Sequence, residues 1–289
     1  MKKSNLGVME STIETLVELA KCGDKGALET LIRKIQDRVY GLAIRMLYYP
    51  ADAEDATQEI LVKIITQLSN FRQECKFDTW VYRIASNHLL NTNKRRAECM
   101  ELTFKQYEEQ IDKGLAQSKI KAVLDAEQNL ITEEIMIRCM QGMLLCFDRD
   151  LRIAFILGGV FDVSSDEAAD ILHIKPSAFR KRYSRARTRI RNFMTRKCGL
   201  FNTVNPCRCS LQVDYAVKTG WINPDNLLFT SHPSNPLKIF NRAERIQEMN
   251  ELERVAALFR CHPDYAAPET FVREIKKLID SGEFRVFDH

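Results

Sequence analysis

The stretch from Asp52 to Arg96 constrains the fold more than any other part of the chain. It combines an acidic helix start, an apolar stripe, an aromatic cluster and a basic end within one short span. Its apolar residues recur at intervals of three and four, which is the period of an amphipathic helix. The same spacing returns in residues 10–47, 132–160 and 165–191, and Gly and Pro are sparse. The sequence therefore predicts an all-α fold.

Four helices are expected in the first hundred residues. Gly23-Asp24 separates the first two, and Tyr49-Pro50 ends the second. A third helix is predicted over 52–68, with Asp52 as its N-cap, because a carboxylate there accepts hydrogen bonds from the first turn. A fourth is predicted from about Asp78, closed by the basic run Lys94-Arg95-Arg96.

The third predicted helix carries an unusual polar face. Acidic side chains in a first turn complement the positive end of the helix dipole. Asp55, Gln58 and Glu59 continue beyond that turn at spacings i, i+3 and i+4, so they share one side of the helix. This spacing is equally compatible with a docking surface and with a plain solvated face.

Aromatic and basic side chains are interleaved around the fourth predicted helix. Single-stranded nucleic acid binds to such a surface, because each base stacks on a ring for about 1–3 kcal/mol and cations follow the phosphates. In the alternative interpretation Phe71, Phe77 and Trp80 belong to the core. A basic final turn is also ordinary helix-dipole chemistry.

Residues 97–130 are polar, mixed in sign and weakly periodic, which predicts a linker with some helix. Beyond it, residues 165–191 predict a helix–turn–helix. Ser164 or Ser165 caps the first helix, and Pro176 suits the first turn of the second.

The helix–turn–helix lies in a strongly basic block. Between Asp170 and Asp214 the sequence has eleven Lys or Arg and no acidic residue. A solvated helix face normally mixes signs, so the block indicates a contact surface for a polyanion. The first turns of its second helix can reach base edges in a major groove, and later residues can hold phosphates.

The nine cysteines do not predict a disulfide framework, because their number is odd and no signal-peptide pattern precedes them. The sequence has no apolar run long enough to cross a membrane, so membrane insertion is not expected. A cytoplasmic protein with reduced thiols is expected instead. Cys198, Cys207 and Cys209 are candidate zinc ligands, with His232, Cys261 or His262 as a fourth. The spacing is not a standard zinc pattern, and free thiols are the alternative.

The sequence resembles a known family in two ordered segments. DAEDATQEILVKI and NFRQECKFDTWVYRIASN resemble region 2 of bacterial RNA polymerase sigma factors of the sigma-70 family, extracytoplasmic-function (ECF) type. DEAADILHIKPSAFRKRYSRAR resembles region 4 of the same family. The resemblance implies an all-α chain with region 2 at 1–97, a linker at 98–130, region 4 at 131–197 and a C-terminal extension at 198–289.

The resemblance also implies partners and contact residues. Core RNA polymerase would dock, through the clamp helices of its largest-type subunit, on Asp55, Gln58 and Glu59. Double-stranded −35 DNA would be read by Ser177, Arg180, Lys181, Ser184, Arg185 and Arg187. The unstacked −10 strand would be bound by Phe71, Trp80, Tyr82, Arg83, Asn87, Asn91, Asn93, Lys94, Arg95 and Arg96.

The resulting prediction is a sigma factor that directs polymerase to promoters and helps to melt them. The predicted function requires no cofactor, and structural zinc in the extension is the one metal considered. An anti-sigma factor is a candidate partner. The alternative is a stand-alone helix–turn–helix regulator with an N-terminal oligomerisation or ligand domain. An enzyme is not expected, because the sequence has no Walker loop, HExxH or GxSxG motif. The extension is predicted to be a regulatory module that folds against the DNA-binding regions.

Overall fold

Every regular element in the described part of the chain is a helix, so the all-α prediction is confirmed. One isolated backbone bridge joins Cys198 to Cys207. No described helix is both long and apolar enough to cross a membrane. The computed structural model describes residues 12–118, 126–230, 251–260, 265–268 and 270–280.

The N-terminal bundle is organised around one long helix, α2, which packs against the other three. Asp24 caps α2 by accepting a hydrogen bond from the amide of Ala27 at 2.8 Å, and Gly23 before it has φ 90°. Glycine suits that conformation because it has no Cβ. The predicted break at Gly23-Asp24 is confirmed. The four helices are α1 (Ile13–Lys21), α2 (Lys25–Leu47), α3 (Pro50–Gln67) and α4 (Phe77–Asn91).

Two predicted helix ends in this bundle are wrong. α3 begins at Pro50, and Asp52 lies buried within the helix instead of capping it. Pro is favoured at the first helical position because its missing N–H would be unpaired there anyway. α4 ends at Asn91, so the basic run 94–96 lies beyond it, at the start of the short helix α5 (Arg96–Cys99).

The helix–turn–helix forms as predicted. Ser164 caps the first helix by accepting a hydrogen bond from the amide of Glu167 at 3.3 Å, and Pro176 opens the second. His173 in the turn has φ 51°, a left-handed conformation that a non-glycine residue adopts under strain. The elements of this half are α7 (Ala126–Leu145), α8 (Arg149–Phe155), the π-helical turn η2 (Ile156–Val160), α9 (Ser165–Ile171) and α10 (Pro176–Lys197).

The glycine pair Gly158-Gly159 has a packing role in this half. Gly158 lies within η2, against α10, and a Cβ added there would lie 3.2 Å from the ring of Phe179. Its neighbour Gly159 faces the ring of Tyr183 in the same way. The missing side chains therefore let η2 approach the aromatic side of α10 closely.

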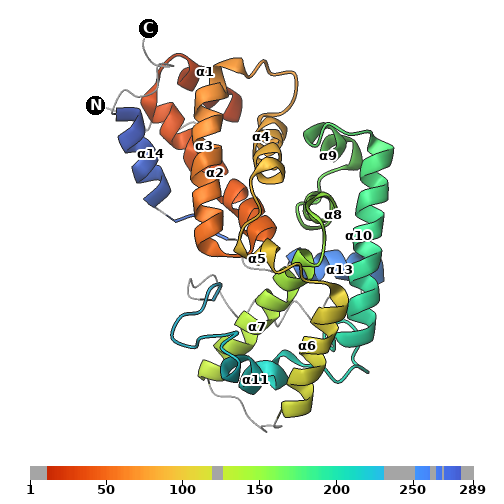
Figure 1. Cartoon of the computed structure of the whole chain (residues 1–289). Helices are drawn as coiled ribbons and strands as arrows, with labels where there is room; N and C mark the ends of the chain where they lie inside the picture. Colours follow the sequence, from red (N-terminus) through yellow and green to blue (C-terminus); the bar gives the residue numbers. More distant parts are fainter. Residues whose placement is uncertain (1–11, 119–125, 231–250, 261–264, 269, 281–289) are drawn as a thin grey trace, which may run out of the picture.

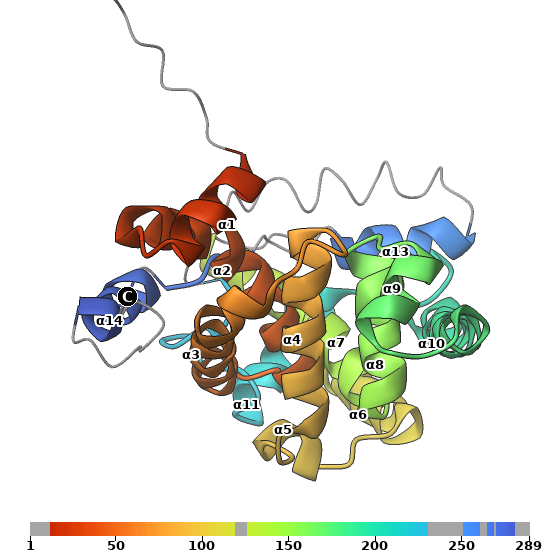
Figure 2. The same cartoon turned by 90° about the horizontal axis from the view of Figure 1, so that it is seen from above.

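The polar stretch after α5 contains a well-packed helix, α6 (Phe104–Gln117). Tyr107 and Ile111 are buried where α6 meets α7, the 3-10 turn η3 (Cys209–Gln212) and α11 (Val213–Lys218). α13 (Glu251–Arg260) packs on η2 and α10. α14 (Thr270–Asp280) lies away from these elements, against α2 (Figures 1 and 2).

Candidate nucleic-acid interface

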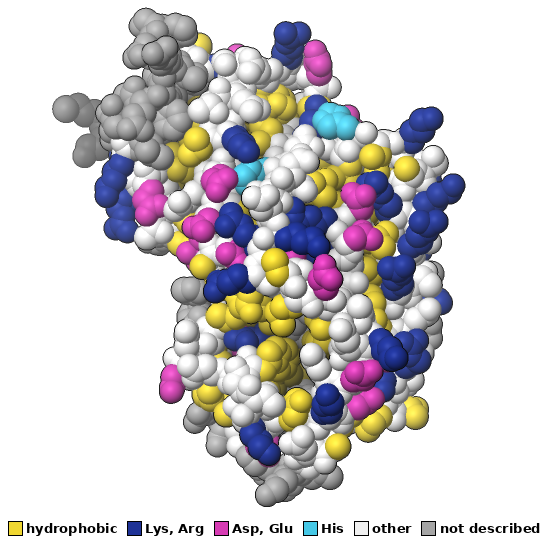
Figure 3. All heavy atoms as spheres, viewed as in Figure 1, with side chains coloured by type: hydrophobic (Ala, Val, Ile, Leu, Met, Phe, Trp, Pro, Cys, Tyr) yellow, Lys and Arg dark blue, Asp and Glu magenta, His cyan; other side chains and the backbone are white. Residues whose placement is uncertain are grey.

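α10 presents a polar, basic surface on the side opposite its packed residues. Phe179, Ala186 and Ile190 are buried against the rest of the helix–turn–helix half. Figure 3 shows Lys and Arg side chains in a row along the edge of the molecule that α10 forms. Five predicted DNA-contacting residues are exposed there: Ser177, Arg180, Lys181, Ser184 and Arg185.

Two of the α10 arginines predicted to contact DNA also have contacts within the protein. The guanidinium of Arg187 lies 5.3 Å from the ring centre of Tyr183, so this predicted −35 residue is half-buried over an aromatic ring. Arg180 lies 3.8 Å from the carboxylate of Asp166 on α9. Both partners of that pair are exposed, and such pairs contribute about 0–1 kcal/mol. The Asp166 contact therefore competes only weakly with a phosphate or base for Arg180.

A polar hollow of about 450 Å³ lies between α3 and α4. Asn87 and Asn91 are exposed at its rim, where amide groups can both donate and accept hydrogen bonds. Lys63 and Glu59 line the α3 side. The hollow thus brings Glu59, predicted for polymerase docking, next to two residues predicted for −10 DNA.

His88 fixes the floor of this hollow. Its Nδ1 lies 2.7 Å from the ammonium of Lys63, and its Nε2 lies 3.5 Å from the carboxylate of Glu59. Burial first, and then the charge of Lys63, lower the pKa of His88, while Glu59 opposes them. The imidazole is therefore neutral at neutral pH, with Nδ1 accepting a hydrogen bond from Lys63 and the proton on Nε2.

The aromatic cluster beside α4 is mainly core. Phe71 is 5% exposed, and its ring centre lies 5.4 Å from that of Phe77 and 5.3 Å from that of Trp80. Lys21 on α1 donates a hydrogen bond to the Phe71 carbonyl at 2.6 Å. The structure thus favours the core interpretation for Phe71, whereas Trp80 keeps a half-exposed side.

Tyr82 and Arg83 lie on the side of α4 that faces the helix–turn–helix. Arg83 donates a hydrogen bond to Asp170 on α9 at 2.7 Å. The ring centres of Tyr82 and Phe161 are 5.5 Å apart. Thr79 adds a hydrogen bond to α9 one turn away, at 2.6 Å. In this conformation α9 and the end of η2 pack on the face of α4 that carries Tyr82 and Arg83, two of the residues predicted to bind −10 DNA.

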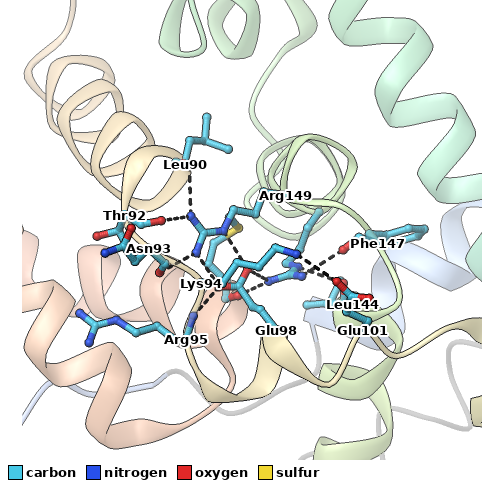
Figure 4. A network of polar contacts seen from close by, with 12 residues as sticks. Leu90, Thr92, Asn93, Lys94, Arg95, Glu98, Glu101, Leu144, Phe147 and Arg149 are labelled. Atoms are coloured by element: carbon cyan, nitrogen blue, oxygen red, sulfur yellow. Dashed lines mark hydrogen bonds and ion pairs between the residues drawn. The ribbon is translucent and has the colours of Figure 1, made fainter.

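Figure 4 shows a network that ties the segment after α4 to α8, and the sequence gives no local signal for it. Arg149 makes a bidentate pair with Glu98, at 2.8 and 2.5 Å, and also donates to the carbonyls of Leu90, Thr92 and Asn93. Arg152, which is 3% exposed, donates to the same carboxylate at 3.0 Å.

The network holds the loop that carries three of the predicted −10 residues. Asn93, Lys94 and Arg95 follow α4 directly, and their backbone is fixed by Arg149 and by Glu98, which accepts from the Arg95 amide at 3.2 Å. The side chains of Asn93 and Lys94 are exposed, that of Arg95 is half-exposed, and Arg96 is exposed at the start of α5. The loop is thus held rigidly while its polar side chains remain accessible.

The polymerase-docking prediction falls on a face of α3 that has an internal neighbour. Asp55 and Glu59 are exposed, and Gln58 is half-buried. The Gln58 amide donates a hydrogen bond to the carboxylate of Glu274 on α14 at 2.5 Å. The sequence reasoning missed this contact, because the two residues are 216 positions apart.

Three cysteines meet at a cavity of about 440 Å³: Cys139, Cys207 and Cys209. Burial raises the pKa of Cys207 to about 11 and that of Cys209 well above its ordinary value, so both are neutral thiols at neutral pH. None of the eight described cysteines forms a disulfide.

The predicted zinc ligands Cys198, Cys207 and Cys209 are not arranged as a metal centre in the structure. Among the described residues no group of three or more His, Cys, Asp or Glu side chains is placed to hold an ion. The proposed fourth ligands His232, Cys261 and His262 lie outside the described residues.

Two family models match the chain, in the order of the two helical halves. The model of Sigma-70 region 2 matches residues 31–98, and that of Sigma-70, region 4 matches residues 137–190. Neither reaches the residues beyond 190. The matched segments hold α2 to α4 in one case and the helix–turn–helix in the other.

Curated relatives agree with these matches. The chain is 31% identical to the ECF RNA polymerase sigma-E factor of Escherichia coli (strain K12) over 188 residues, which are 63% of this chain and 93% of the relative. It is 29% identical to the RNA polymerase sigma-H factor of Pseudomonas aeruginosa over 181 residues, 61% of this chain and 91% of the relative. The chain belongs to the sigma-70 family of RNA polymerase sigma factors, ECF type.

The solved structures that match include a complex of the sigma factor RpoE with the anti-sigma factor NepR from Bartonella quintana. The match has a TM-score of 0.38 and 19% identity, over 57% of this chain and 95% of the other. A similarity at that level says nothing about how the helices of this chain are arranged.

Proposed function

We propose that this chain binds core RNA polymerase, directs it to promoters through −10 and −35 elements and promotes promoter melting. The observation that carries the proposal is the exposed basic face of α10, in a chain whose other half belongs to sigma region 2. A stand-alone regulator needs the first feature and has no use for the second. No observation favours that alternative.

At the −35 element, α10 is proposed to enter the major groove with its N-terminal turns foremost. Ser177, Arg180 and Lys181 lie in these turns and are exposed. An arginine can donate two hydrogen bonds to the O6 and N7 of guanine, which discriminates by about 1–3 kcal/mol per good pair. Ser184 and Arg185 lie further along the same exposed face, where phosphate contacts are expected.

At the −10 element, the hollow between α3 and α4 is proposed to capture an unpaired base. Extruding a base costs a few kcal/mol, and hydrogen bonds to its polar edge recover that cost. Asn87 and Asn91 supply the amides, and the exposed side chains of Asn93, Lys94 and Arg96 supply polar and cationic contacts for the backbone. Melting by capture makes and breaks no covalent bond, so the proposed function needs neither catalytic residues nor a cofactor.

Four of the predicted DNA contacts are less accessible than the others: Phe71, Tyr82, Arg83 and Arg187. Phe71 is buried, and Arg187 is stacked on Tyr183. Arg83 and Tyr82 are only partly accessible, because Arg83 pairs with Asp170 on α9 and Tyr82 packs on Phe161 at the end of η2. Trp80 stays a candidate because its side chain is only partly buried.

The polymerase-docking face is proposed to be the α3 surface of Asp55, Gln58 and Glu59, with the clamp helices as its partner. An anti-sigma factor is a further proposed partner, and a cytoplasmic location follows from polymerase and DNA as partners. The division of the chain at residues 97, 130 and 197 stays a prediction.

Core binding tests the docking proposal. Asp55→Lys reverses an exposed charge on α3 and is expected to weaken binding of the purified protein to core RNA polymerase at least tenfold. Asp225→Lys makes the same change at an exposed site in the C-terminal segment and is expected to bind like the unmodified protein. Equal binding by both variants would contradict the assignment of this face.

A further inference from the structure

The α14 helix packs on the N-terminal bundle through one apolar face. Phe271, Val272 and Ile275 are buried, whereas Arg273 on the other side is exposed. The ring of Phe271 meets that of Tyr40 on α2 edge to face, with centroids 6.3 Å apart. An apolar stripe at this spacing is typical of a helix that has a partner surface. Its partner surface here is the bundle formed by α2 and α3.

Polar contacts fix the position of α14 on that bundle. Lys276 pairs with Glu29 on α2 at 3.1 Å. The segment leading into the helix is held as well, because the amide of Ala267 donates to the carboxylate of Asp37 at 2.9 Å. Contacts at both ends of the segment therefore define one orientation for α14.

The helix reaches the proposed polymerase-docking face. Glu274 accepts the hydrogen bond from Gln58, which lies in the middle of that face. Ile275 and Lys277 bound one side of an open hollow of about 600 Å³, and Gln58 and Glu59 bound the other. An α-helix with its side chains is about 10 Å across. A partner helix that docks on Gln58 and Glu59 would therefore collide with α14.

We propose that α14 is an internal competitor of core RNA polymerase for the α3 face, so that the chain binds polymerase fully only after α14 is released. This inference rests on the proposed function, since it takes that face to be the docking site. Glu274 hydrogen-bonds the Gln58 amide, which the proposed function assigns to the polymerase contact. The extension would then be a tethered inhibitor encoded in the sigma chain itself.

The competition is expected to be reversible and of moderate strength. A tethered segment acts at an effective concentration in the millimolar range, so a weak contact can still occupy its site. The apparent dissociation constant for polymerase is the intrinsic constant divided by the fraction of molecules in which the face is open. If α14 is seated in about nine molecules of ten, its release raises the affinity about tenfold.

A pair of matched substitutions in the full-length protein tests this inference. Ile275→Glu puts a carboxylate into the buried side of α14 and leaves α2 and α3 unchanged. Arg273→Glu puts the same side chain on the exposed side of the same helix. The dissociation constant for core RNA polymerase is measured for both, and for the unmodified protein, by fluorescence anisotropy at one salt concentration.

Ile275→Glu is expected to bind core about tenfold more tightly than the unmodified protein, and Arg273→Glu is expected to bind like it. Unchanged or weaker binding by Ile275→Glu would overturn the inference, the latter by making α14 part of the docking surface. The proposed function fails separately, if neither the unmodified protein nor Ile275→Glu binds core at all.

Hydrogen exchange on the unmodified protein provides a test that needs no substitution. If polymerase displaces α14, the backbone amides of 270–280 exchange faster in the complex with core than in the free protein. If α14 stays seated beneath or beside the polymerase, the same amides exchange at an equal or slower rate, and the inference is wrong. Amides of α1, which packs against α2, serve as the internal reference.

Discussion

Replacing Glu98 with Gln is expected to destabilise the whole chain, because two arginines then lose the carboxylate that neutralises them. Glu98 is 8% exposed and Arg152 is 3% exposed, and Arg149 holds both carboxylate oxygens. Removing one partner of a buried ion pair costs about 3–5 kcal/mol, since the other charge stays buried. Folded proteins have about 5–15 kcal/mol in total, so the loss is a large share.

Urea unfolding, followed by the fluorescence of the two tryptophans, measures this effect. With a slope of about 1–3 kcal/mol per molar urea, the midpoint of Glu98→Gln is expected to fall by about 1–5 M. Glu101→Gln is the matched control, because Glu101 pairs with Lys94 at 3.4 Å on the surface. Exposed pairs contribute about 0–1 kcal/mol, so the midpoint of the control barely moves.

The dependence of stability on pH tests independently whether the ionised Glu98 carboxylate stabilises the fold. Burial raises the pKa of Glu98, but the hydrogen bond from Arg149 and the charge of Arg152 outweigh it, so the pKa lies below its ordinary 4.5. A carboxyl whose pKa is depressed in the folded state stabilises the fold above its unfolded pKa, and this contribution is lost as the pH falls through the folded pKa. The difference between Glu98→Gln and the unmodified protein is therefore largest at neutral pH and shrinks in acid. Equal midpoints for Glu98→Gln and Glu101→Gln at pH 7 would refute the reasoning.

Arg180→Ala is expected to weaken binding to the preferred −35 duplex by about 5- to 150-fold, the equivalent of about 1–3 kcal/mol, with little loss on unrelated duplexes; equal losses on all duplexes, measured by anisotropy, would make it a phosphate contact. Asn91→Ala is expected to slow promoter opening, measured with a fluorescent base in the −10 element, while duplex binding is retained; unchanged opening would remove Asn91 from the capture site. Replacing Cys207 and Cys209 with Ser is expected to leave the metal content of the purified protein unchanged, because the described cysteines are not placed to hold an ion; a lower content, measured by mass spectrometry, would identify these thiols as ligands.

Features with local signals were predictable from the sequence. Ser164 and Pro176 mark the two helix starts of the helix–turn–helix, and each acts on its own first turn. Gly23-Asp24 likewise marks a break through local backbone chemistry. Where two local signals compete, the sequence does not decide between them. Asp52 was predicted to cap α3, but the helix begins two residues earlier, at Pro50.

The features that the sequence could not predict depend on distant partners. Glu98 has no local pattern that announces Arg149 and Arg152, which lie 51 and 54 residues further along. Phe71 looks the same in sequence whether it stacks on a base or packs edge to face against Phe77. The buried residues of α14 show no local pattern that identifies α2 or α3 as their partner surface.

Run-off transcription with purified core RNA polymerase tests the central claim most directly. The reaction is performed with and without this protein, on fragmented genomic DNA of the source organism, and is repeated with Ile275→Glu. The account predicts discrete transcripts that depend on the added protein, share −10 and −35 sequences upstream of their starts and become more abundant with Ile275→Glu. If neither protein yields such transcripts and neither binds core, the chain does not act as a sigma factor under these conditions, and that result would contradict the account.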